Sequence, residues 1–218
     1  MSVATVHGFP LPDTPYEMWV RGELDEYLHL PDDGTKVEVV GGEIVVSPSP
    51  VPSHYFVVKS IERAMYQAEM ADPDFRWESM QAVDLNMAPI KDGYIPDLMI
   101  MDSGTAFGIF EDDRKAVRPE QLEAVVEVTS PSNARNDRPP RLVQVAGTKW
   151  SAYARSGIPF YLLVERDPSK PGVTLFGEPH LPSGTYETLH FWKFGETVKL
   201  PEPLGFEIET ERWRPWDE

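Results

Sequence analysis

Two short apolar runs, each carrying one carboxylate, constrain the fold more than any other feature of the sequence. Residues 95–102 read IPDLMIMD and residues 124–132 read AVVEVTSPS, with Asp97 at the start of the first run and Glu127 inside the second. Such runs are typical of buried strands, where an acid costs free energy unless it is paired, hydrogen-bonded or bound to a metal. Two such strands side by side would bring together the hard oxygen ligands that suit Mg²⁺ or Mn²⁺.

The composition limits the class of protein. The chain has 218 residues, is 41% hydrophobic and contains no cysteine, which excludes disulfides, thiolate zinc sites and cysteine nucleophiles. No apolar run approaches the ~20 residues that cross a bilayer. Residues 1–15 lack the basic-then-apolar pattern of a secretory signal. We therefore expect one domain over residues 1–218 with a loose segment over 1–15, a cytoplasmic location and no membrane partner.

The net charge of the chain is strongly negative, but the charged residues are unevenly distributed along it. The net charge of −16 argues against loose, sequence-independent binding to nucleic acid, which depends on neutralising phosphates. Between residues 132 and 157, however, five basic residues accompany one acid, Asp137. The basic residues are Arg135, Arg138, Arg141, Lys149 and Arg155. The cluster predicts either a solvated helix face or a local phosphate-binding rim.

The apolar periodicity predicts a mixed α/β (α+β) chain. Helices are expected over residues 16–30, 54–70 and 141–156, and residues 103–120 are expected to form a surface loop. Strands are expected over 36–40, 43–47, 76–87, 95–101, 122–129 and 160–165, followed by a meander over 173–177, 186–192 and 197–200. Gly41 and Gly42 permit the positive φ of a tight N-terminal hairpin. This order indicates a mixed α/β fold in one domain.

Asp97, Glu127 and Lys149 each allow a functional and a plainer interpretation. Asp97 could cap the start of a strand, and Glu127 could face solvent on a half-covered sheet. Lys149 stands four residues before Tyr153, so the two can share a helix face. A lysine aimed at a metal–carboxylate cluster could orient or help deprotonate a water, or stabilise charge on phosphate, whereas the plainer interpretation is an exposed lysine.

Two further polar residues are candidates on weaker grounds. His54 opens the second helix and could act as an acid, a base or a metal ligand, or simply be exposed at the helix start. Glu38 lies in the strand VEVV and could face outward from the hairpin. The sequence has no Walker A loop, dinucleotide glycine fingerprint, G-x-S-x-G elbow or H-E-x-x-H helix. A glycosidase carboxylate pair stays open, because separation in space decides it.

Four sequence blocks, taken together and in order, resemble the Uma2 (DUF820) family of the PD-(D/E)XK nuclease superfamily. They are VEVVGGEIVVSPSPVPSH, YIPDLMIM, VVEVTSPSNARNDR and KWSAYARSGIPFYLLVE. The resemblance runs from about residue 36 to residue 165. It implies a restriction-endonuclease-like core: a mixed β-sheet flanked by helices, with a divalent metal, Mg²⁺ or Mn²⁺, at its acidic centre.

The resemblance also implies roles for individual residues. Asp97, after Pro96, matches the PD element and Glu127 matches the (D/E) element. Thr129 stands where a lysine is expected two residues later, and Lys149 matches a lysine moved to the following helix. The segment between residues 137 and 149 is longer than this family leads us to expect.

The remaining polar matches follow the same pattern. His54 and Glu38 fall on positions that resemble other family-typical polar residues. Asp137 resembles the acid that follows the SPS element.

The resulting expectation is a metal-dependent endonuclease acting on DNA. Asp97, Glu127 and the backbone carbonyl of Val128 would hold the metal, and Lys149 would orient or activate water with help from His54 or Glu38. The basic residues expected to contact the DNA backbone are Arg135, Arg138 and Arg141. A homodimer is compatible with duplex cleavage, which needs two sites.

Two alternatives stay open from the sequence. The first is a nuclease-like module without catalysis that binds protein or nucleic acid. The second is a glycosidase or other carboxylate hydrolase, whose activity would survive EDTA.

Overall fold

A mixed six-stranded sheet forms the centre of the molecule. The computed structural model describes residues 4–6, 10–140 and 147–217. The central sheet has the order β12-β11-β10-β9-β7-β4, in which only β9 and β10 run parallel. Its strands are β4 (Trp77–Met80), β7 (Leu98–Asp102), β9 (Ala124–Val128), β10 (Phe160–Glu165), β11 (Gly172–His180) and β12 (Thr185–Trp192). The α+β architecture with a mixed sheet flanked by helices, expected from the sequence, is confirmed.

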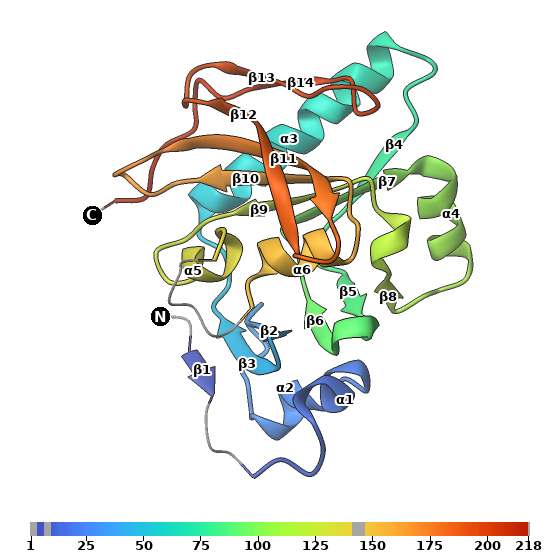
Figure 1. Cartoon of the computed structure of the whole chain (residues 1–218), viewed down its shortest axis with the longest axis vertical. Coiled ribbons are helices and arrows are strands. Elements are labelled where there is room, and N and C mark those ends of the chain that lie inside the picture. The colour runs from blue at the N-terminus through green and yellow to red at the C-terminus, as the bar shows by residue number, and fades with distance from the viewer. Residues whose placement is uncertain (1–3, 7–9, 141–146, 218) are drawn as a thin grey trace.

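Helices cover the two faces of this sheet because its strands are apolar on both sides. Leu98 and Val126 pack into a core that includes α3 (Pro52–Ala71), whereas Met99 and Val125 pack into a second core that includes α6 (Lys149–Arg155). Figure 1 shows α3 and α6 on opposite sides of the sheet. A strand buried on both faces lacks the usual polar alternation, which is why 124–128 reads as a continuous apolar run.

A second six-stranded sheet stands beside the α6 side of the first and has the order β1-β3-β2-β6-β5-β8 (Figure 1). Its strands are β1 (Ala4–Val6), β2 (Lys36–Val40), β3 (Glu43–Ser47), β5 (Asp84–Met87), β6 (Asp92–Tyr94) and β8 (Ala116–Val117). The predicted β2–β3 hairpin is confirmed: Gly41 and Gly42 have φ of 61° and 79°. Asp92 Oδ2 and Oδ1 accept hydrogen bonds from their two N–H groups at 2.8 and 3.0 Å.

The remaining elements are short. They are α1 (Pro15–Val20), α2 (Leu24–Tyr27), α4 (Ser103–Glu111), α5 (Ala134–Asp137), the 3₁₀ turns η1 (Ala88–Ile90) and η2 (Pro119–Gln121), and the separate pair β13 (Thr197–Lys199) and β14 (Glu207–Glu209). No helix among the described residues is long and apolar enough to cross a membrane.

The strand expected over 76–87 is wrong as a single element. It divides into β4 of the central sheet and β5 of the second sheet. Ala82 between them has a φ of 56°, in the left-handed region that breaks an extended chain. A run of apolar residues does not reveal such a break, because both halves are extended and partly buried.

The loop expected over 103–120 is also wrong. Asp102 accepts a hydrogen bond from Gly104 N at 3.0 Å and so caps α4, which buries Ala106 and Ile109. Further along, β8 pairs in parallel with β5. The mixture of Gly, Phe and acids in this segment hides the short apolar face that holds the helix on the core.

Smaller differences concern the ends of predicted elements. The helix expected over 16–30 divides into α1 and α2 at Gly22, whose φ is 71°. The last predicted strand of the meander pairs with β14 instead of β12, while β10, β11 and β12 form the meander. Within the segment expected to be loose, Ala4–Val6 pairs with β3. The helix expected over 141–156 begins at Lys149 in the described part of the chain.

Gly93 allows α1 to pack directly on β6. A Cβ at Gly93 would lie 2.3 Å from the ring of Trp19, which is buried and donates a hydrogen bond to Val37 O at 3.0 Å. We expect Gly93→Ala to lower the free energy of unfolding by about 1–3 kcal/mol, because the ring has to move. Gly108→Ala, with open space around it in α4, is the control and should be neutral or stabilising by up to ~1 kcal/mol. Urea denaturation of both variants tests this, and equal midpoints would contradict it.

Candidate metal centre and active-site cleft

Asp97 and Glu127 lie at neighbouring positions of adjacent strands. In the antiparallel β7–β9 pair, Leu98 is opposite Val126, so one step along the ladder sets Asp97 opposite Glu127. Residues directly opposite each other share a face of the sheet, which here is the α6 face. Both side chains line the same cleft. The structure thus brings these two acids together, as the apolar runs predict.

The backbone of Val128 lies beside the Asp97 carboxylate. Its N–H donates to Asp97 Oδ2 at 2.8 Å. The N–H and C=O of one strand residue point to the same side, so the Val128 carbonyl is directed toward the Asp97 edge as well. The three groups that the sequence proposes as metal ligands are therefore neighbours.

His54 and Lys36 keep Asp97 ionised. His54 Nε2 lies 3.0 Å and Lys36 Nζ 3.8 Å from Asp97 Oδ1. Burial by itself would raise the pKa of Asp97, but His54 and then Lys36 outweigh it and lower the pKa to about 2. His54 reaches this position because it stands in the first turn of α3, whose N-terminal end borders the cleft.

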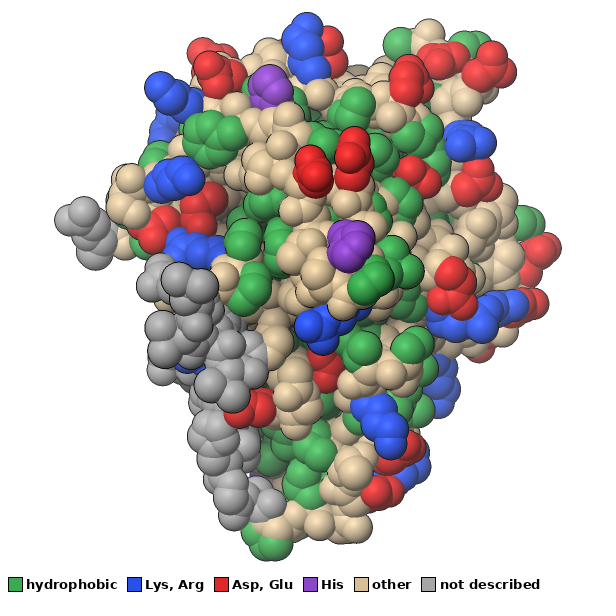
Figure 2. Space-filling view, in the orientation of Figure 1, with side chains coloured by type: hydrophobic (Ala, Val, Ile, Leu, Met, Phe, Trp, Pro, Cys, Tyr) green, Lys and Arg blue, Asp and Glu red, His purple; other side chains and the backbone are tan. Residues whose placement is uncertain are grey.

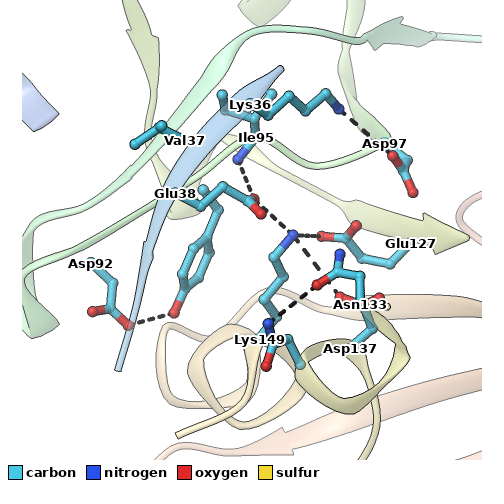
Figure 3. A network of polar contacts seen from close by, with 12 residues as sticks. Lys36, Val37, Glu38, Asp92, Ile95, Asp97, Glu127, Asn133, Asp137 and Lys149 are labelled. Carbon is cyan, nitrogen blue, oxygen red and sulfur yellow. Dashed lines mark hydrogen bonds and ion pairs between the residues drawn. The ribbon is translucent and has the colours of Figure 1, made fainter. Parts of the chain in front are cut away.

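Lys149 is buried among carboxylates. Its Nζ lies 2.7 Å from Glu38 Oε1, 3.1 Å from Glu127 Oε1 and 4.0 Å from Asp137 Oδ1 (Figure 3). Tyr153 OH donates a hydrogen bond of 2.6 Å to the same Glu127 oxygen. The long segment before Lys149 therefore does not displace it. We define these four charged residues, Glu38, Glu127, Asp137 and Lys149, as the Lys149 cluster.

The Lys149 cluster connects four elements. Glu38 comes from β2, Glu127 from β9, Asp137 from α5 and Lys149 from α6. Glu38 Oε1 also accepts a hydrogen bond of 2.8 Å from Ile95 N, on the chain that leads into β7. The cluster thus joins the second sheet, which contains the β2–β3 hairpin, to the start of β7 in the central sheet, where Asp97 lies.

Negative charge is in excess within the Lys149 cluster. Burial raises the pKa of Glu127 to about 7, with Lys149 offsetting part of the effect and Asp97 adding to it. Burial and the nearby Glu127 raise the pKa of Asp137 well above its usual value. Neither Asp137 oxygen has a hydrogen-bond partner among the described residues. Buried, closely spaced acids hold protons unless another cation neutralises them.

Lys149 itself stays charged. Burial alone would lower its pKa, but Glu127 and Glu38 outweigh burial and raise the pKa well above its usual value. In this arrangement Lys149 is a fixed positive charge and not a base.

The donor set suits a hard divalent cation. Glu127 Oε1 is engaged by Lys149 and Tyr153, while Oε2 accepts no hydrogen bond from a described residue and Glu127 lines the cleft. Across the ranges that the structure describes, no three metal-binding side chains already surround one point. Mg²⁺ is commonly held by one or two carboxylates with waters and substrate oxygens, and two acids with a carbonyl fit that pattern.

Of the three arginines predicted to contact DNA, the structure describes Arg135 and Arg138. Arg138 Nε and Nη2 bind Glu165 and Asp167 at 2.6 and 2.9 Å, so its charge is already paired. Arg135 is exposed and forms no ion pair within the described ranges, and Arg141 lies outside the described residues. On the visible face in Figure 2, acidic and basic side chains are interspersed.

The cleft itself has a volume of about 980 Å³ and is more basic than the surface as a whole. Its charged lining comprises four basic and four acidic residues in a chain of net charge −16. They are Lys36, Lys149, Arg166, Arg214, Glu38, Asp97, Glu127 and Asp217. Sequence reasoning missed Lys36, Arg166 and the C-terminal residues 214–217, because no local pattern connects them with the acidic strands.

The family comparison covers the candidate metal centre. The family model Uma2, described as "Putative restriction endonuclease", matches residues 24–211. The chain belongs to the Uma2 family. The match includes Asp97 and the whole Lys149 cluster, so the candidate centre lies within the part that defines an Uma2 protein.

One solved structure gives a weaker comparison. It is the crystal structure of "a putative nuclease belonging to DUF820" from Anabaena variabilis, with 16% sequence identity and a TM-score of 0.49. The match covers 82% of this chain and 88% of that one. No curated protein matches the sequence.

Removing the central cation tests the electrostatics of the site. We expect Lys149→Met to lower the free energy of unfolding by about 3–5 kcal/mol at neutral pH, because buried carboxylates lose their partner. The loss should shrink as the pH falls, since Glu127, with its raised pKa, takes up a proton in the folded state and no longer needs the ammonium. Lys36→Met, which loses a 3.8 Å contact at the cleft, should change stability by ~1 kcal/mol or less. Denaturation at pH 5 and pH 8 measures both, and a pH-independent loss for Lys149→Met would contradict this account.

Proposed function

We propose that this Uma2 protein is a divalent-metal-dependent endonuclease that hydrolyses DNA phosphodiester bonds. The observation that carries the proposal is the position of Asp97 and Glu127, which share one face at adjacent strand positions and open onto one cleft. Family membership supports the same class of activity. The sequence has neither the Walker A loop of nucleotide-driven hydrolases nor the G-x-S-x-G elbow of serine hydrolases.

Asp97, Glu127 and the Val128 carbonyl would hold the metal, Mg²⁺ or Mn²⁺. A bound divalent ion of this kind polarises a phosphoryl oxygen and lowers the pKa of a coordinated water. The excess of buried carboxylates supports the assignment, because a second cation relieves their repulsion.

The surrounding residues would fix these two acids. His54 and Lys36 keep Asp97 ionised and hold its Oδ1 on the cleft side. Lys149 and Tyr153 both bind Glu127 Oε1, which directs the carboxylate and leaves Oε2 for a ligand. Glu38 in turn holds the Lys149 ammonium in place. Oriented charges of this kind need no rearrangement when a phosphate gains negative charge, and Lys149 would then serve as an electrostatic stabiliser.

The charge balance of the cleft agrees with a nucleic-acid substrate. A polyanion is repelled by a surface of net charge −16, but the cleft lining carries equal numbers of basic and acidic residues. A divalent ion would make the cleft net positive. Affinity would then depend on the metal and on a few contacts close to it, with a small contribution from the outer surface.

One observation favours a second function, a nuclease-like module that binds without cutting. The Lys149 ammonium is fully buried and already contacts two carboxylates, and Thr129 stands at the position where a nuclease lysine is expected. A scaffold that retains the cleft but cannot activate water would have this appearance.

A nuclease assay separates the two functions. We expect cleavage of DNA in Mg²⁺ or Mn²⁺ that stops in EDTA and falls at least about a hundredfold in Asp97→Ala and Glu127→Ala. The control is Asp217→Ala, which removes a cleft carboxylate outside the proposed metal centre and should retain cleavage. Equal activity in the wild type and the two metal-centre variants would exclude this function. Metal-dependent DNA binding without cutting would support the binding module.

A further inference from the structure

Arg166 is a buried arginine without a carboxylate partner. It is 3% exposed, yet it lines the cleft and makes no ion pair within 4.0 Å among the described residues. Burial lowers its pKa, and Asp217, which also lines the cleft, only partly compensates. An unpaired buried cation is unfavourable, so such a group commonly serves a charged ligand.

The hydrogen bonds of Arg166 leave part of the guanidinium available. Nε donates to Arg214 O at 3.0 Å and Nη2 donates to Ser53 Oγ at 2.9 Å. A guanidinium has five N–H donors, so three have no partner within the described chain. Two of these three are the N–H groups of Nη1, which donates to none of the described residues. These donors are in the fork geometry that matches a phosphate.

The groups beside Arg166 also favour an anion. Ser53 is in the first turn of the 20-residue helix α3, whose N-cap residue, Val51, offers no side-chain cap. The N-terminus of a long helix attracts negative charge. Lys36 also lines the cleft, with its Nζ 3.8 Å from Asp97 Oδ1. The start of α3 and Lys36 therefore add positive potential to the cleft that Asp97 and Glu127 also line.

The C-terminal segment places an aromatic ring at this side. Trp213 is buried and its Nε1 donates to Ser60 Oγ on α3 at 2.8 Å, which anchors the segment. Trp216 N donates to Arg166 O at 3.0 Å, so the segment and Arg166 are joined in two places. Trp216 is only half-buried and lines the cleft. An aromatic face at the edge of a cleft that offers phosphate-binding donors is a stacking platform for an unpaired base.

We propose that Arg166 and Trp216 form a nucleotide subsite beside the metal centre. Arg166 binds a backbone phosphate that is not the one cleaved, and Trp216 stacks on an unpaired base of the same strand. The subsite rests on the proposed function and specifies its substrate as DNA with a single-stranded or frayed segment. A base within an intact duplex offers no free face to Trp216.

Binding to a short fluorescent single-stranded oligodeoxynucleotide, measured by polarisation with Ca²⁺ in place of Mg²⁺, tests the subsite. We expect Arg166→Gln to weaken binding about tenfold and to reduce the slope of log affinity against log salt by about 0.7, the value for one lost phosphate contact. Arg166→Lys keeps the charge, so it should retain the salt slope while losing affinity. If Arg166→Gln disturbs the fold, this second variant still measures the phosphate contact. Arg63→Gln removes an exposed charge outside the cleft lining and is the matched control.

The same assay tests the stacking role. We expect Trp216→Ala to weaken binding about tenfold with an unchanged salt slope, and Trp216→Phe to bind nearly as the wild type. The wild type should prefer the single strand over a blunt duplex of the same sequence, and Trp216→Ala should lose that preference.

The outcomes separate the subsite from the proposed nuclease. Oligonucleotide binding that depends on Arg166 and Trp216 without any cleavage would support the subsite and reject the nuclease. Cleavage with unchanged binding in the Arg166 and Trp216 variants would reject the subsite alone. No binding of the oligonucleotide, or equal binding of strand and duplex in every variant, would overturn the inference.

Discussion

The candidate site depends on one buried ammonium group surrounded by acids. Lys149 has almost no contact with solvent and lies between Glu38 and Glu127, with Asp137 slightly farther away. A charge in this position is stable only when its partners are correctly placed. Those partners come from β2, β9 and α5. The interaction that stabilises the ammonium therefore also fixes the second sheet, which contains β2, against the central sheet. The geometry of Glu127 at the cleft follows from it.

The arrangement concentrates negative charge where a cation can enter. Three carboxylates share one ammonium in the Lys149 cluster, and Asp97 stands at the next strand position with its own partners, His54 and Lys36. The protein therefore holds one acid ionised and another with a raised pKa side by side. Such a pair is typical of sites that exchange protons for a metal ion.

Local patterns in the sequence singled out Asp97 and Glu127, because an acid inside an apolar strand is conspicuous and strand neighbours share a face, whereas Glu38 was a candidate on weaker grounds. They also predicted the hairpin and the mixed α/β class, whereas the mixed sheet flanked by helices was implied by the family resemblance. They could not settle whether Lys149 reaches the site, which depends on the path of the chain between residues 137 and 149. They also suggested Arg138 as a DNA contact, whereas its partners, Glu165 and Asp167, are set by tertiary structure.

Arg166 and Trp216 illustrate the same limit more strongly. They are fifty residues apart, and neither stands in a recognisable motif. They meet because Trp213 anchors the C-terminal segment on α3 and because Arg166 bonds to that segment. Contacts of this kind follow from packing between distant segments, and periodicity along the chain carries no signal for them.

Calorimetric titration with Mn²⁺ tests the central claim most directly, since the claim is that Asp97 and Glu127 bind one divalent ion together. The account predicts one saturable site in the wild type, with affinity lost or greatly reduced in both Asp97→Asn and Glu127→Gln and unchanged in Glu207→Gln, an exposed acid on β14. Binding of equal strength in all four proteins, or no binding in the wild type, would contradict it.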